Sequence, residues 1–153
     1  MTDSKSIHSG QCQCGNIRYR INGEPLTLYA CHCRDCQAQS ASAFGLSMLV
    51  AVVDFELAAG KLKFWSATTD DGSAKHCAFC PRCGTRIYHA SDDTTAPISV
   101  KAGSLDSISQ LAPVAHIWTK RAHHWLDLEQ PGTIVCPGQP DDFTEIIDAW
   151  ACR

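Results

Sequence analysis

The chain has 153 residues, of which 44% are hydrophobic and 19% are charged, and this composition is typical of one globular domain with a buried core. The formal net charge of −3 and the sequence pI of about 6.1 argue against nucleic acid or an anionic membrane as the main partner. Residues 1–11 are too polar for a secretory signal, and no long apolar run predicts a membrane span. We therefore expect a single domain, residues 1–153, located in the cytoplasm.

Short stretches of β pattern recur along the chain and predict a mainly β fold. In the first of them, residues 16–21, the apolar side chains of Ile17, Tyr19 and Ile21 share one face. The other expected strands are residues 26–30, 44–53, 61–67, 85–90, 98–102 and 116–119. Turn signals that contain glycine separate several of these strands.

One helix is expected near the end of the chain. Its apolar side chains follow the spacing i, i+3, i+4 and i+7, which predicts a single apolar stripe. The stripe consists of Phe143, Ile146, Ile147 and Trp150. Asp141 and Asp142 precede it, where acidic residues favour a helix N-terminus. We expect this helix to pack against the sheet.

The ten cysteines indicate metal binding more strongly than disulfide bonding. Cys12 and Cys14 are separated by one residue, as are Cys31 and Cys33, and a disulfide across so short a loop would be strained. The same pairs are natural ligands of zinc, which binds cysteine thiolates.

Two motifs end in a glycine that directly follows a cysteine. They are C-x-C-G at residues 12–15 and C-P-x-C-G at residues 80–84. Glycine tolerates positive φ and allows backbone N–H groups to turn toward thiolate sulfur. Together the motifs supply four thiolates for a closed structural zinc site, made of Cys12, Cys14, Cys80 and Cys83. Two alternatives stay open: one motif pairs with the central cysteine motif, or Cys77 displaces one of these ligands.

The central motif is C-x-C-x-x-C at residues 31–36. Its three thiols, Cys31, Cys33 and Cys36, can bind one face of a zinc ion and leave its fourth position open, which is the catalytic pattern of zinc sites. His32 lies inside the motif, but its side chain should point away because neighbours alternate along the chain. Cys136 and Cys152 are isolated and are expected to be free thiols.

Four stretches of the chain resemble the glutathione-dependent formaldehyde-activating enzyme family, whose relatives include the centromere protein V group. They are residues 10–19, 31–36, 79–85 and 101–106, followed by His116-Ile117 and Trp125. The resemblance implies a zinc-stapled β-tent of several coiled antiparallel sheets, which is a fold shared with a Rab-GTPase chaperone. It also implies two zinc ions per chain, a structural one on Cys12, Cys14, Cys80 and Cys83 and a second one on Cys31, Cys33 and Cys36.

By the same resemblance the expected activity is that of a carbon–sulfur lyase. Three thiolates outweigh the charge of one zinc ion, so the second site suits a fourth thiolate better than a strong hydroxide. A small thiol, glutathione by family analogy, would bind there and attack an aldehyde such as formaldehyde. Asp35 and His32 are candidates for the proton step, and Cys31, Cys33 and Cys36 form the catalytic site.

The alternative is a non-catalytic zinc-binding or chaperone-like module in which both zinc ions are structural. The fourth ligand of the second zinc discriminates between these two functions. Binding to nucleic acid or chromatin is disfavoured by the acidic charge, and the basic residues available for it are Lys61, Lys63, Lys75, Lys120 and Arg121.

Overall fold

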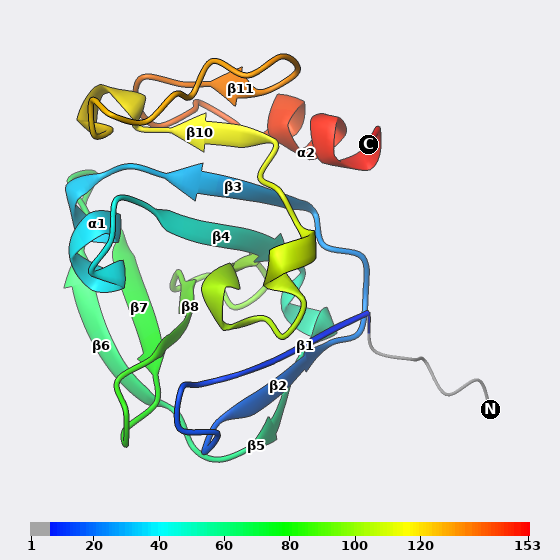
Figure 1. The fold of residues 1–153 in the computed structure, drawn as a ribbon. Coiled ribbons are helices and arrows are strands. Elements are labelled where there is room, and N and C mark those ends of the chain that lie inside the picture. Colours follow the sequence, from blue (N-terminus) through cyan, green and yellow to red (C-terminus); the bar gives the residue numbers. More distant parts are fainter. Residues whose placement is uncertain (1–6) are drawn as a thin grey trace.

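The computed structural model describes residues 7–153, which form two β-sheets and two α-helices (Figure 1). The mainly β fold expected from the sequence is therefore confirmed. The smaller sheet is antiparallel, with the strand order β1-β2-β5. Its strands are β1 (His8–Gln11), β2 (Arg18–Ile21) and β5 (Phe55–Ala59).

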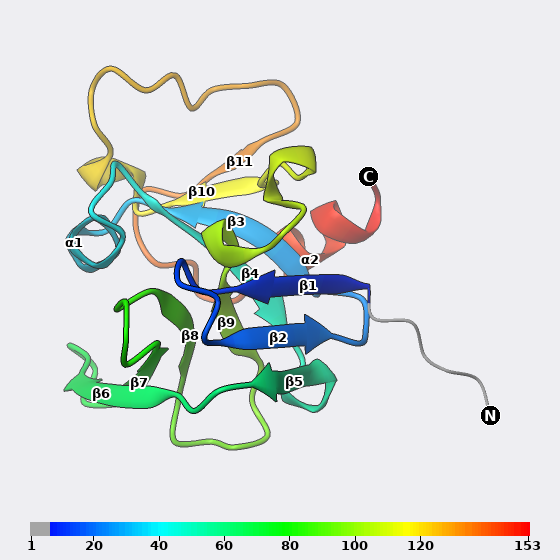
Figure 2. The same ribbon diagram turned by 60° about the horizontal axis from the view of Figure 1, so that its bottom comes forward.

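The larger sheet has eight strands in the order β11-β10-β3-β4-β9-β8-β7-β6. They are β3 (Thr27–Cys31), β4 (Gly45–Val50), β6 (Lys63–Thr68), β7 (Ala74–Phe79), β8 (Arg86–Ala90), β9 (Ile98–Lys101), β10 (Ala115–Ile117) and β11 (Ile134–Val135). Its pairings are antiparallel except that β10 runs parallel to both β3 and β11. The small sheet faces the larger one across the core, as Figure 2 shows from below.

Every stretch predicted as a strand contains one, but the boundaries differ. Residues 44–53 hold β4 and then a 3-10 turn, η1 (Val52–Asp54). Strand β10 ends early because Trp118 has a φ of 59°, a left-handed conformation that cannot continue a strand. The strands β1, β5, β7 and β11 were not predicted. Strand β1 has the polar sequence HSGQ, and a Cβ at its Gly10 would lie 2.3 Å from the Tyr19 ring, so close packing rather than an apolar pattern selects it.

The main core lies between the two sheets. Strand β2 alternates as predicted, because Tyr19 and Ile21 are buried while Arg18 and Arg20 are exposed. Each fully buried aliphatic side chain contributes roughly 1.5–3 kcal/mol relative to an exposed one. The buried aliphatic residues that meet those of β2 include Leu28, Met48, Val50, Ile87 and Val100.

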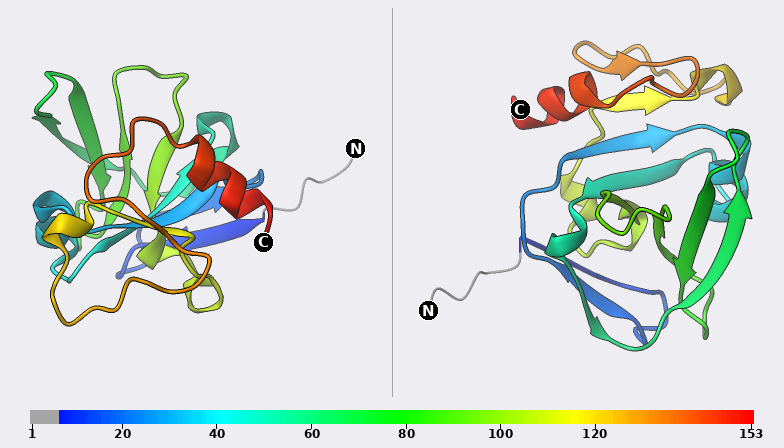
Figure 3. Two further views of the ribbon diagram at one scale, coloured as in Figure 1. Left: turned by 90° about the horizontal axis from the view of Figure 1, so that it is seen from above. Right: turned by 180° about the vertical axis from the view of Figure 1, so that it is seen from behind.

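The predicted C-terminal helix is α2 (Thr144–Ala151), and it packs on β3 on the outside of the larger sheet (Figure 3). Ile146 and Trp150 of the apolar stripe are buried. The hydroxyl of Thr27 donates a hydrogen bond of 3.0 Å to the carbonyl oxygen of Ile146 and so ties the helix to β3. The carboxylate of Asp142 accepts a hydrogen bond of 2.8 Å from the Thr144 N–H, which stabilises the helix start.

A second helix, α1 (Arg34–Ser40), follows β3 directly and was not predicted. Its sequence RDCQAQS has no apolar period, and the residue after it, Ala41, adopts a left-handed φ of 50° where glycine is usual. Three further 3-10 turns complete the fold: η2 (Ala102–Ser104), η3 (Ile108–Gln110) and η4 (Thr119–Arg121). No helix within residues 7–153 has the length and apolar character needed to cross a membrane.

Candidate metal centres

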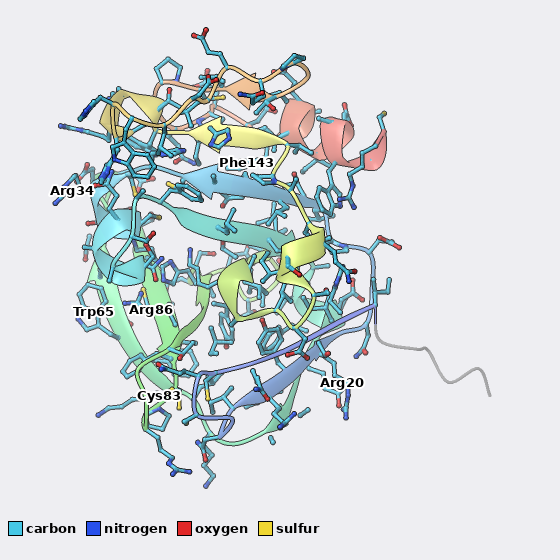
Figure 4. All side chains as sticks on the ribbon, in the orientation of Figure 1. Arg20, Arg34, Trp65, Cys83, Arg86 and Phe143 are labelled. Carbon is cyan, nitrogen blue, oxygen red and sulfur yellow. The ribbon has the colours of Figure 1, made fainter. Side chains whose placement is uncertain are left out.

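Four cysteines from two distant segments meet at the end of the small sheet. Cys12 and Cys14 follow β1, and Cys80 and Cys83 lie in the turn between β7 and β8. Their four sulfur atoms all lie within 4.8 Å of one another, and Cys14 Sγ is 3.8 Å from Cys80 Sγ. We call this group the four-cysteine cluster; Figure 4 labels Cys83 in it.

Two short loops with similar geometry form this cluster. Gly15 has a φ of 75° and Gly84 a φ of 79°, so each loop closes through the positive-φ residue that the motifs predict. The glycine N–H groups bond to the carbonyl oxygens of Cys12 and Cys80, at 3.0 and 2.9 Å. An N–H group that reaches a sulfur atom is that of Ile17, which donates to Cys12 Sγ at 3.2 Å.

The Cys83 thiol of this cluster ionises more readily than an ordinary cysteine, because its pKa is lowered. The Thr85 hydroxyl lies 3.2 Å from Cys83 Sγ. Hydrogen bonds from the Thr85 side chain and backbone lower the pKa of Cys83 to about 5. Because the thiolate is the form that binds metals, the surroundings of Cys83 favour a ligand role.

The other motif forms a separate group, the three-cysteine cluster of Cys31, Cys33 and Cys36, whose sulfur atoms also lie within 4.8 Å of one another. Cys31 is the last residue of β3, Cys33 is the N-cap of α1, and Cys36 lies in the first turn of α1. The strand-to-helix junction brings the three thiols together over six positions of sequence. This helix was not predicted from the sequence.

Helix capping and a glycine shape the three-cysteine cluster. The N–H of Cys36 donates to Cys33 Sγ at 3.3 Å, in the way an N-cap side chain accepts. Hydrogen bonds from Cys31 and Cys36 lower the pKa of Cys33, so Cys33 is the thiol that ionises most readily. Gly45 of β4 pairs with Cys31, and a Cβ at Gly45 would lie 3.3 Å from Cys36 Cβ. The glycine therefore leaves room for Cys36.

His32 turns away from the cluster, as predicted. It is fully buried, and its Nε2 lies 2.9 Å from Nδ1 of His116. The Phe44 ring packs against it at 5.2 Å. Burial lowers the pKa of His32 to about 4, so the imidazole is neutral at neutral pH. His32 does not line the cavity described next, and its candidacy for a proton step is withdrawn.

A cavity of about 770 Å³ adjoins the three-cysteine cluster and is lined by all three of its cysteines but by none of the four-cysteine cluster. We call it the thiol cavity. Its wall carries cations of decreasing exposure: Arg34 and Arg121 are exposed, Lys75 is half-buried and Lys101 is buried. Figure 4 shows Arg34 at the start of α1, far from Cys83 in that view.

Acidic residues line only the outer part of the thiol cavity. Asp35, Asp70 and Asp71 are all exposed, and Asp35 pairs with Lys75 at 3.7 Å. At the inner end, the Lys101 ammonium donates a hydrogen bond of 3.0 Å to the Ser47 hydroxyl. Burial lowers the pKa of Lys101, while the charges of Cys36 and Cys31 act in the opposite direction.

Sequence reasoning did not identify Lys101 or Ser47 as site residues. Their neighbour Tyr29, which donates or accepts a hydrogen bond of 3.3 Å with Ser99, was also missed. All of these side chains lie on strands and point to one face of the sheet. They are neighbours in space only because of the strand register, which the sequence does not reveal. The available signal was a lysine directly after the buried residues Ile98 and Val100 of an alternating strand pattern.

The remaining cysteines join neither cluster. Cys77 lies fully buried in β7, while Cys136 is half-buried and Cys152 is exposed. All ten cysteines are free thiols in the structure. Two alternatives from the sequence do not match this grouping: that Cys77 displaces a ligand, and that one C-G motif pairs with the central cysteine motif.

The donor sets fit zinc. Tetrahedral zinc with bonds of about 2.3 Å to sulfur separates its ligand atoms by about 3.8 Å. The contacts Cys12–Cys14 at 3.6 Å and Cys14–Cys80 at 3.8 Å are close to that separation. Soft thiolate ligands also favour zinc over magnesium or calcium, which prefer oxygen. Both clusters could hold a metal ion.

A sequence profile of the family described as glutathione-dependent formaldehyde-activating enzyme matches residues 7–121. The chain therefore belongs to this family, as the cysteine motifs predicted. A crystal structure of a Rhodobacter sphaeroides protein has a similar fold, with a TM-score of 0.53 and 16% sequence identity. The alignment covers 84% of this chain and 98% of that one. No curated protein matches the sequence.

Proposed function

We propose that the protein is a zinc-dependent carbon–sulfur lyase that forms or breaks the adduct between a small thiol and an aldehyde. One observation carries the proposal: the three-cysteine cluster borders the thiol cavity, and the four-cysteine cluster does not line it. Family membership supports the same class of chemistry.

The ligand counts assign different roles to the two clusters. Four thiolates complete a tetrahedral zinc ion, so Cys12, Cys14, Cys80 and Cys83 would hold a structural zinc. Cys31, Cys33 and Cys36 would hold the second zinc and leave one position on the side of the cavity. When bound there, zinc would supply a site at which a small thiol is held as its thiolate.

The lining of the thiol cavity suggests which thiol it accepts. Its volume of about 770 Å³ lies within the range typical of small-molecule sites. The exposed guanidinium groups of Arg34 and Arg121 suit carboxylates, and the carboxylates of Asp70 and Asp71 suit an ammonium group. A thiol of the amino-acid type that carries both charges, such as glutathione, matches this lining.

The reaction needs no oxidant or reductant. The thiol sulfur forms a bond to the carbonyl carbon, and the π electron pair of the C=O bond moves to oxygen. The oxygen takes up the proton that the thiol released, which gives an S-hydroxymethyl thiol from formaldehyde. Lysis is the reverse. Asp35 lies at the mouth of the cavity and is the remaining side-chain candidate for carrying that proton.

The direct test is turnover by the metal-loaded protein. With glutathione and ¹³C-formaldehyde near equilibrium, NMR exchange spectroscopy should show the protein accelerating interconversion of free aldehyde and adduct. Cys33→Ser should remove the acceleration, while Cys152→Ser, which changes an exposed thiol outside both clusters, should keep it. Rates equal to the uncatalysed reaction for glutathione, cysteine and other small thiols would contradict the proposal and favour the non-catalytic zinc module.

Cobalt substitution tests the open coordination position separately. The visible spectrum of cobalt changes when a fourth sulfur joins three, so added glutathione should alter it. Binding should strengthen as pH rises toward the thiol's own pKa of about 8.5, because coordination releases a proton. The Cys33→Ser variant should give no response. A wild-type spectrum indifferent to small thiols would mean that a protein group already closes the site.

A further inference from the structure

Lys101 is a buried cation whose charged form is favoured by the charges of Cys36 and Cys31 rather than by a carboxylate. It ends β9, is only 8% exposed, and lines the thiol cavity. Among residues 7–153, no aspartate or glutamate lies within salt-bridge distance of it. Lys75, on the same cavity wall, has Asp35 at 3.7 Å. Buried charges in proteins are usually paired, so the site of Lys101 is that of an anion-binding group.

The hydrogen bonds of Lys101 support the same interpretation. An ammonium group has three donors. Within the described residues, Nζ donates one hydrogen bond, to Ser47 Oγ at 3.0 Å. Two donors are therefore left without a protein acceptor at the inner end of a cavity. Unused donors in a buried site are suited to an oxygen atom of a ligand.

The strand register places this group beside the three-cysteine cluster. Tyr29, Ser47 and Lys101 form one row across β3, β4 and β9. Cys31 lies two residues from Tyr29 on the same strand, so its side chain shares their face. The cysteines and the ammonium thus line one wall, and all of them border the thiol cavity.

We propose that Lys101, held by Ser47, is a catalytic residue that binds the carbonyl oxygen of the aldehyde during attack by the thiol, an inference that rests on the proposed function. As the S–C bond forms, the π pair of the C=O bond moves to this oxygen, and the ammonium stabilises the negative charge that develops there. The proton lost by the thiol ends on the oxygen, so Lys101 is unchanged at the end. Fixed donors aimed at developing charge are an established source of rate enhancement.

Kinetics of substituted, metal-loaded proteins test the role in turnover. Lys101→Met should lower kcat about 100-fold, which is the usual effect of losing one oxyanion donor. The KM for the thiol should change little, and the protein should keep both metals. Arg121→Met, which removes a guanidinium group proposed to bind the thiol's carboxylate, should instead mainly raise that KM. Lys63→Met changes an exposed lysine outside the cavity and should alter neither constant.

Two outcomes would overturn this role. If Lys101→Met loses the metal of the three-cysteine cluster by elemental analysis, then Lys101 serves to balance the thiolate charge. If Lys101→Met raises the KM for the thiol and leaves kcat unchanged, then Lys101 binds the thiol's carboxylate. Lys101→Arg, which keeps the charge, should recover part of kcat, because the donors remain but shift in position.

A binding measurement separates this inference from the proposed reaction. In protein labelled with ¹⁵N-lysine, the Nζ signal of Lys101 is the one that Lys101→Met lacks. Sodium formate, a planar oxygen anion, should shift that signal saturably, and sodium chloride at equal ionic strength should not. Ser47→Ala should weaken the response. A signal indifferent to formate overturns the inference even if turnover is observed. A formate response without wild-type turnover supports the anion site and overturns the proposed reaction.

Discussion

The four-cysteine cluster and the three-cysteine cluster differ in how much of the chain each joins. The first brings together Cys14 and Cys80, which are 66 positions apart, and connects the small sheet to the larger one. The second lies within one strand-to-helix junction, where hydrogen bonds of β3 and α1 already fix the backbone. Metal in the four-cysteine cluster would therefore contribute mostly to folding. Metal in the three-cysteine cluster, which the fold needs less, can take part in a reaction.

The largest expected effect comes from removing one ligand of the four-cysteine cluster. We predict that Cys83→Ser gives a chain that does not fold or that aggregates. Binding of a structural zinc is worth about 10–16 kcal/mol in zinc-finger peptides, comparable with the roughly 5–15 kcal/mol of a whole domain. Soluble yield and far-UV circular dichroism check this. A Cys83→Ser protein that melts like wild type would refute the structural role, and Cys152→Ser is the matched control.

The next effect separates the two clusters. Cys33→Ser should reduce the metal content from close to two zinc ions per chain to close to one, because the four-cysteine cluster stays intact. The fold should survive with a stability loss on the order of 2–3 kcal/mol, which lowers Tm by about 5–10 °C. Elemental analysis and calorimetry measure both quantities. An equal decrease in Tm for Cys33→Ser and Cys83→Ser would show that both clusters stabilise the fold to the same extent.

A smaller effect should follow from filling the space beside Cys36. Gly45→Ala puts a methyl group 3.3 Å from Cys36 Cβ and 3.1 Å from the Gln39 amide nitrogen. Such overpacking costs about 1–3 kcal/mol, and we expect it to weaken metal binding at the three-cysteine cluster in competition with a chelator. Gly103→Ala is the control, since nothing lies within 4 Å of a Cβ there. Identical chelator sensitivity of the two variants would contradict the packing argument.

The smallest effect concerns a contact outside both clusters. Thr27→Val removes the hydroxyl that binds the Ile146 carbonyl and leaves that buried acceptor without its donor. Denaturant unfolding should show a loss of about 1 kcal/mol. Metal content and chelator sensitivity should match the wild type at both clusters. Metal loss from Thr27→Val would mean that α2 supports the three-cysteine cluster through β3.

The sequence predicted those parts of the molecule that a local pattern encodes. The alternation of β2 and the apolar stripe of α2 follow from periodicity, and the grouping of the cysteines follows from spacing and from glycines at positive φ. Helix α1 escaped prediction because its seven residues carry no apolar period, and its N-cap is a cysteine. Lys101 and Ser47 escaped because they meet only through the register of β4 with β9, which sequence spacing does not reveal.

The separation of Cys14 from Cys80 also sets an order of assembly during synthesis. At about 5–20 residues per second, the ribosome adds the intervening 66 positions in about 3–13 s. The ligands of the three-cysteine cluster are all made early in that interval, whereas Cys12 and Cys14 must wait for their partners. We therefore expect the nascent chain to bind metal at the three-cysteine cluster first. Until Cys80 and Cys83 emerge, the first two cysteines remain the thiols most open to oxidation or to capture by another metal.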